Sequence, residues 1–173
     1  MELTGLEVAF VAGEGVLTFG HAGERLTIRS HWLNDRFAQL IGCVDSLATG
    51  AEVASCRWQG PINDGHFIDL VADPDGGLNL AIHQFNYPDA IKASEIWSAV
   101  RGPAVLVCHQ PLTDFVCLFA AAIRRVRATL VDGDGLIKQY PRPFPFALFE
   151  QLERSAARAG YQPTPLAELD GSA

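Results

Sequence analysis

Two short alternating segments joined by a turn form the clearest structural pattern in this sequence. Residues 65–72 read GHFIDLVA, residues 78–83 read LNLAIH, and Asp-Pro-Asp-Gly-Gly connects them. Proline fixes φ and glycine tolerates positive φ, so the connection has the chemistry of a tight turn. The pattern predicts a β-hairpin with a four- or five-residue connection. It favours a mostly antiparallel sheet, in which one face of each strand is buried.

Similar alternation predicts further strands on both sides of the hairpin. They cover residues 6–11, 16–19, 25–30, 52–58 and 104–108. Turn residues separate the first three strands, at 12–15 and 21–24. Residues 94–100 have a pattern that fits either a strand or a short helix. The segment 136–140 is a further short candidate.

Helical spacing of apolar residues marks three other segments. They are expected at about 33–48, from Leu112 to Leu130, and at about 145–159. Ser30 or Asn34 is a candidate N-cap of the first helix. Pro111 stands at the start of the second, where a first-turn proline is favoured.

The element order is therefore βββ-α-βββ(β)β-α-(β)-α, which predicts an α+β fold. We expect a mostly antiparallel sheet of about six to seven strands with three helices on one face. The chain has 173 residues, which suits a single domain. We expect that domain to span 1–162, followed by a flexible tail at 163–173.

Composition limits the classes of protein to which the chain can belong. It is 49% hydrophobic and 19% charged, as in a folded domain. It has neither an apolar run near the ~20 residues of a membrane span nor the features of a signal peptide, so we expect a cytoplasmic location and no membrane partner. The four cysteines have no C-x-x-C spacing and are expected to be reduced core residues.

Negative charge is concentrated in one part of the chain. The net charge is −7, and residues 58–91 contain five aspartates but no lysine or arginine. This acidity argues against nucleic-acid binding and favours a basic protein partner. Asp64, Asp69, Asp73 and Asp75 are therefore candidate partner-binding residues.

Aromatic side chains accompany these aspartates. Trp58, Phe85 and Tyr87 are candidate anchors for a partner, because Trp and Tyr are enriched at interfaces. Core packing is the ordinary alternative for the same side chains.

The alternation of the hairpin raises a related question about its outer face. If Ile68, Leu70 and Ala72 face the core, Asp69 faces outward together with Phe67 and Val71. Such an apolar outer face would be covered either by another element of the fold or by a partner.

No short catalytic signature is present, which makes a non-enzymatic role the favoured one while leaving catalysis open. His66 and His83 flank the hairpin and could form a metal or acid–base cluster with a nearby aspartate, although solvent-facing histidines are the simpler interpretation. Asp-x-Asp-Gly at 73–76 and at 132–135 lacks the further ligands of a calcium loop. We expect no catalytic residue, no metal and no cofactor.

Between about Leu26 and Arg127 the chain resembles small immunity proteins of bacterial polymorphic-toxin and contact-dependent inhibition systems. The resembling features are a helix followed by AEVASCRWQG at 51–60, the hairpin, and the LTDFVCLF start of a long helix at 112–119. The resemblance implies a small, acidic, cytoplasmic α+β domain that plugs a basic toxin. That class has no invariant motif, so no functional residue is carried over.

The leading hypothesis is thus a non-enzymatic protein-binding domain, an immunity protein that neutralises a basic toxin through an acidic hairpin surface. One alternative is a small-molecule-binding or catalytic α+β domain with its site near His66 and His83. Another is a structural homodimer that buries a sheet face or an edge strand.

Overall fold

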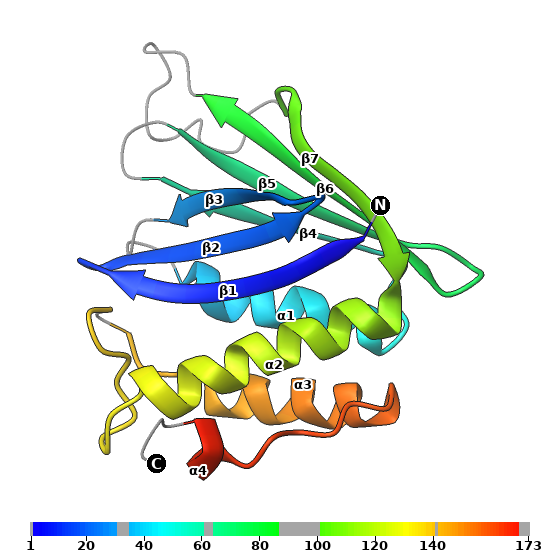
Figure 1. Ribbon diagram of the computed structural model, residues 1–173. Helices are drawn as coiled ribbons and strands as arrows, with labels where there is room; N and C mark the ends of the chain where they lie inside the picture. Colours follow the sequence, from blue (N-terminus) through cyan, green and yellow to red (C-terminus); the bar gives the residue numbers. More distant parts are fainter. Residues whose placement is uncertain (1, 31–34, 61–63, 87–100, 141, 170–173) are drawn as a thin grey trace.

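A computed structural model describes residues 2–30, 35–60, 64–86, 101–140 and 142–169. The strands are β1 Leu3–Val11, β2 Glu14–His21, β3 Glu24–Ser30, β4 Val53–Gln59, β5 Asp64–Ala72, β6 Gly77–Asn86 and β7 Ala104–Pro111. The helices are α1 Arg36–Ala48, α2 Leu112–Leu130, α3 Phe146–Arg158 and α4 Leu166–Leu169. Figure 1 shows α1, α2 and α3 gathered on one side of the strands.

Within the described residues, the strands form two antiparallel sheets. The first sheet has the order β1-β2-β3 and the second the order β4-β5-β6-β7. This arrangement confirms the predicted α+β class and the order of elements. The predicted hairpin is the β5–β6 pair, in which Ala72 lies opposite Leu78.

Two tight turns shape the first sheet. Ala12 and Gly13 connect β1 to β2, Ala22 and Gly23 connect β2 to β3, and all four have positive φ. Positive φ at both central residues is the two-residue turn whose twist matches that of the paired strands. The turns expected at 12–15 and 21–24 are thereby confirmed.

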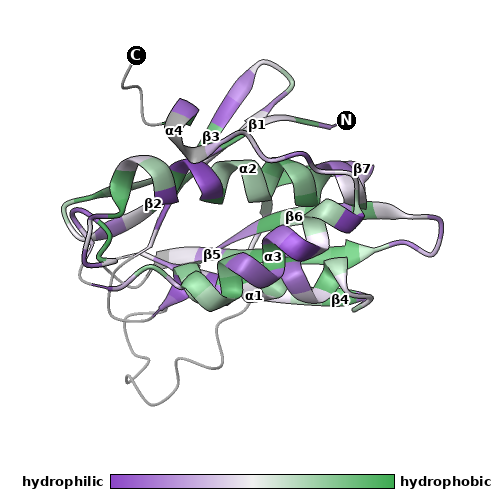
Figure 2. Cartoon of the chain, turned by 90° about the horizontal axis from the view of Figure 1, so that it is seen from below, coloured by the Kyte–Doolittle hydropathy of each residue, from purple (hydrophilic) through white to green (hydrophobic). Residues whose placement is uncertain are grey.

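The core lies between the second sheet, the helices and the inner face of the first sheet. Alternate residues in the middle of β4, β5 and β6 are buried there, including Cys56, Leu70 and Leu80. Helix α1 packs on β4, α2 packs on β1, and α3 packs on α1 and α2. Figure 2 shows from the helix side that the helices carry both apolar and polar stretches, as expected for one buried and one solvent face.

Trp58 of β4 joins the two sheets inside this core. Its side chain is 1% exposed, and a Cβ added to Gly15 of β2 would lie 3.1 Å from its Cζ2 atom. The absence of a side chain at Gly15 therefore lets the indole ring approach the first sheet closely.

A buried side-chain amide connects the sheets a second time. The backbone N–H of Leu3 donates to Oε1 of Gln110 at 2.9 Å, and Gln110 is buried. This bond ties the start of β1 to the end of β7, and it satisfies a polar group that would be costly to bury alone.

The ends of the helices differ in detail from the predictions. Asp35, rather than Ser30 or Asn34, caps α1, because its carboxylate accepts from the N–H of Ala38 at 3.1 Å. Helix α4 lies within the segment expected to be a loose tail, and Arg124 donates to the carbonyl oxygen of Thr164. The strand or helix suggested for 94–100 falls outside the described residues. None of the described helices combines the length and the apolar composition needed to cross a bilayer.

We predict that Gly65→Ala destabilises the fold and that Gly42→Ala does not. A Cβ at Gly65 would lie 2.7 Å from both the backbone oxygen of Trp58 and the Cζ atom of Phe85. Gly42, inside α1, has open space around its Cβ position, and alanine is favoured there by roughly 0.5–1 kcal/mol. Urea unfolding of both variants measures the difference, and equal stabilities would contradict the close packing at Gly65.

Candidate functional site

The outer face of the second sheet is the surface that points away from the helices. Cross-strand partners share a face, so the register of the strands defines it in rows. One row contains Val53, Val71, Asn79 and His109, the next Ser55, Asp69, Ala81 and Val107, and a third Arg57, Phe67 and His83. This face contains most of the candidate chemistry of the chain.

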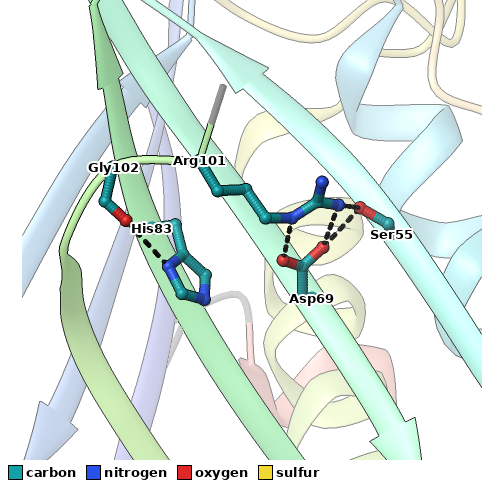
Figure 3. Close-up of polar contacts among 5 residues, drawn as sticks. All are labelled: Ser55, Asp69, His83, Arg101 and Gly102. Atoms are coloured by element: carbon teal, nitrogen blue, oxygen red, sulfur yellow. Dashed lines mark hydrogen bonds and ion pairs between the residues drawn. The ribbon is translucent and has the colours of Figure 1, made fainter. Parts of the chain in front are cut away.

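An ion pair occupies the centre of the outer face. Arg101, which precedes β7, donates from Nε to Oδ2 of Asp69 at 2.5 Å and from one terminal nitrogen to Oδ1 at 2.8 Å (Figure 3). The hydroxyl of Ser55 donates to the same carboxylate at 2.6 Å. Asp69 is therefore held by three charge-assisted hydrogen bonds, so it does not project as a free charge.

These contacts keep Asp69 ionised. Partial burial favours the neutral acid, but the hydrogen bonds from Arg101 and Ser55 outweigh it, and the pKa of the Asp69 carboxyl lies below its ordinary value. The same carboxylate raises the pKa of Arg101. A general acid or base for neutral pH needs a carboxyl pKa shifted the other way, so Asp69 is suited to a structural role.

Two arginines cover the aromatic part of the face. The guanidinium of Arg101 lies 4.4 Å from the centroid of the Phe67 ring, and that of Arg57 lies 5.2 Å from it. Phe85 packs against Phe67 with ring centroids 4.9 Å apart. Other elements of the fold thus cover Phe67, so this outward-facing side chain is not open to a partner.

The other half of the face is open. Val53 and Val71, which are paired across β4 and β5, are 62% and 40% exposed. Val107 of β7 is also 62% exposed and lies opposite Ala81 of β6. We call Val53, Val71 and Val107 the valine patch.

Carboxylates border the valine patch at the β5–β6 turn. Asp73 accepts hydrogen bonds from the Asn79 amide at 2.8 and 2.9 Å, and its Oδ2 lies 3.1 Å from Nε2 of His109. Asp75 accepts from the N–H of Gly77 at 3.4 Å. A hollow of about 360 Å³ next to this turn is lined by Glu2, Asp75 and His109, among others.

The predicted partner-binding residues do not form one exposed surface. Asp69 and Asp73 have partners within the protein, and Asp75 is exposed in the turn. Asp64 is the first residue of β5, and its side chain falls outside the described part of the chain, as does all of Tyr87.

The aromatic anchors need a correction. Trp58 is 1% and Phe85 is 2% exposed, so neither ring is available to a partner on this folded surface. Trp58 points into the core between the sheets, whereas Phe85 is covered by Phe67 and Arg57. Core packing, the alternative considered for both, describes the position of Trp58, whereas Phe85 is buried on the outer face of the sheet.

The suggested site near His66 and His83 is also corrected. His83 pairs with Phe67, whereas His66 pairs with Gln84, so the two histidines lie on opposite faces of the sheet. Nδ1 of His83 lies 3.1 Å from the carbonyl oxygen of Gly102 (Figure 3). Among the residues that the structure describes, no three His, Cys, Asp or Glu side chains are grouped closely enough to hold a metal ion.

Arg57 and Arg101 are the residues of this site that sequence reasoning missed. Both lie outside 58–91, so a charge count within that segment could not include them. Arg57 could have been found because alternation places it on the same face as Ser55. Arg101 is 32 positions from Asp69, and no local pattern links the two.

We predict that Asp69→Asn lowers the free energy of unfolding by about 0.5–1 kcal/mol at pH 7, the range of partly exposed ion pairs. Because the folded-state pKa of Asp69 is depressed, its contribution is present above the unfolded pKa, about 3.9, and is lost as pH falls through the folded value. Urea unfolding at several pH values should show the difference from wild type disappearing in acid.

Glu7→Gln is the control for this prediction. Glu7 pairs with Arg25 at 2.5 Å, but both side chains are more exposed than those of the Asp69 pair. We expect a smaller effect, since solvent screens that pair. A loss at Asp69 that stays constant down to pH 2 would contradict the assigned charge interaction.

Comparison of the chain with protein-family models, with curated proteins and with solved structures finds no match.

Proposed function

We propose that this chain is a non-enzymatic protein-binding domain that docks a basic protein on the outer face of its second sheet. The observation that carries the proposal is the valine patch beside the carboxylates of the β5–β6 turn. Three valines are exposed on the face opposite the helices, where they add little buried apolar surface to the fold. Exposed apolar side chains next to charged ones are common in protein interfaces.

The valine patch would supply affinity. Val53 and Val107 are each more than half exposed, and a partner that covered them would gain on the order of 1 kcal/mol for each. The strands beneath them are held by continuous antiparallel pairing from β4 to β7. Docking on such a surface costs little ordering of backbone.

The carboxylates would supply selectivity for a basic partner. Glu2 and Asp75 are both exposed, and they line the hollow at the β5–β6 turn together with His109 of the outer face. The net charge of −7 acts in the same direction. Such charges mainly raise the association rate and suppress wrong partners.

Neutralisation of a basic toxin in the bacterial cytoplasm is the specific form of this proposal. It rests on the resemblance to small immunity proteins, together with the carboxylates of the β5–β6 turn. In that role the domain would cover a basic active site, and Asp69 and Arg101 would shape the docking surface while Glu2 and Asp75 would face the partner. The alternative explanation of the exposed valines is a homodimer, in which two copies of this chain associate through the same valine patch.

A photocrosslinking amino acid placed at position 53 or at position 107 tests the docking surface directly. We expect the same basic protein to be captured from both positions in the native cell. Position 11 is the control, because Val11 is 46% exposed but belongs to the first sheet. Capture of a second copy of this chain from positions 53 and 107 would instead establish the homodimer.

With the captured protein in hand, Val53→Ser combined with Val107→Ser should weaken binding about thirtyfold, as loss of roughly 2 kcal/mol of apolar burial requires. Val11→Ser should leave the dissociation constant unchanged. Isothermal titration calorimetry measures both, and unchanged affinity of the double variant would rule out the valine patch as the interface.

The role of charge has its own matched pair of variants. Glu2→Gln with Asp75→Asn should slow association several-fold at low salt, and the difference should shrink as salt rises. Glu150→Gln with Glu168→Gln changes the net charge equally on exposed positions of α3 and α4. Equal effects of the two pairs would show that the overall net charge, rather than the carboxylates beside the valine patch, sets the association rate.

A further inference from the structure

Two cysteines far apart in the sequence meet beneath the second sheet. Cys43 belongs to α1 and Cys56 to the inner face of β4, and this helix packs on this strand. The Sγ atom of Cys43 lies 3.6 Å from the carbonyl oxygen of Ser55, the residue before Cys56, and the Sγ atom of Cys56 lies 3.9 Å from Oε1 of Gln39, one helical turn before Cys43. Both are free thiols in the structure. The pair lies across the sheet from the docking surface, and its chemistry is independent of the function proposed above.

The surroundings of the two sulfur atoms differ. Cys43 is half-buried, and its Sγ atom lies 3.6 Å from the carbonyl oxygen of Ser55. Cys56 is fully buried, with its Sγ atom 3.9 Å from both the carbonyl oxygen of Arg36 and Oε1 of Gln39. Cys43 is therefore the more accessible of the two thiols to an oxidant in solution.

The two thiols also differ in reactivity because their pKa values are shifted in opposite directions. A hydrogen bond from Cys56 lowers the pKa of Cys43 to about 7 against the opposing effect of burial. The interaction with Cys43 and burial raise the pKa of Cys56. Since thiolates are the nucleophiles, Cys43 has the greater share of reactive form at neutral pH.

We propose that Cys43 is an oxidation site and that Cys56 is its resolving thiol. The Cys43 thiolate attacks one oxygen of hydrogen peroxide, the O–O bond breaks, and the products are a sulfenic acid on Cys43 and, after protonation, one water molecule. The Cys56 sulfur then attacks the Cys43 sulfur and displaces hydroxide, which leaves as water with the Cys56 proton. The sum is two thiols and one peroxide giving one disulfide and two waters.

The disulfide would join α1 to β4 covalently. Its formation requires the two Cα atoms to come within roughly 4.4–6.8 Å of each other, so a linked peptide would show that α1 and β4 reach that separation. The bond would be reversed by a dithiol reductant through thiol–disulfide exchange.

The other two cysteines are internal controls. Cys108 is buried on β7, and desolvation raises the pKa of its thiol. Cys117 on α2 is half-buried like Cys43, but burial and the nearby Asp114 raise its pKa. Cys117 thus has similar access to solvent without the partner thiol, and comparison with it separates reactivity from exposure.

Treatment of the folded wild-type protein with equimolar hydrogen peroxide, followed by intact mass spectrometry and peptide mapping, tests the proposal. We expect a mass loss of about 2 Da, the two hydrogen atoms given up by a disulfide, a peptide linking Cys43 to Cys56, and recovery with dithiothreitol. Oxidation of Cys117 at the same rate as Cys43, or no linked peptide, would overturn it.

Cys56→Ala separates the two steps. Without the resolving thiol, Cys43 should retain its sulfenic acid, which dimedone traps as a stable adduct, and the wild-type protein should give much less of that adduct. Equal dimedone labelling in the two proteins would overturn the role of Cys56. The wild-type mapping stands on its own if the variant fails to fold.

Discussion

Burial of Trp58 between the two sheets is the interaction on which the rest of the structure depends. The indole ring fills the space against Gly15, while the backbone of the same residue leaves no room for a side chain at Gly65 of the neighbouring strand. Core aromatics of this size bury more apolar surface than most other side chains. With the first sheet held against β4 in this way, the helices can close the remaining side of the core, and the opposite face of the second sheet is left to solvent.

The Asp69–Arg101 pair has a comparable effect on that outer face. It removes one negative charge from the count of free acids and places a guanidinium over Phe67. The aromatic part of the surface is thereby closed by the chain itself, whereas the valines on the same face remain exposed. The acidic segment is therefore not a uniform negative surface, because exposed valines and an internal ion pair share this face with the free carboxylates.

Most of the fold could be predicted from the sequence because the alternation and the helical spacing of apolar residues are local properties. The hairpin at β5–β6, the strands before it and the cores of α1 and α2 follow from them. The split into two sheets did not, since it depends on Trp58 and Gly15 meeting across 43 positions. The pairing of His66 with His83 failed for a different reason. The connection could be four or five residues long, and a slip of one residue moves a side chain to the other face.

Side chains alternate along the strands of the second sheet, so the residues that pack in the core are separate from the residues that face solvent. Val53 and Val107 point outward between core neighbours such as Ala54 and Cys108. Each outward residue can therefore change without disturbing the packing beneath it. A sheet of this kind lends itself to divergence: descendants of one ancestor could acquire different partners through a few outward substitutions while inheriting the same interior.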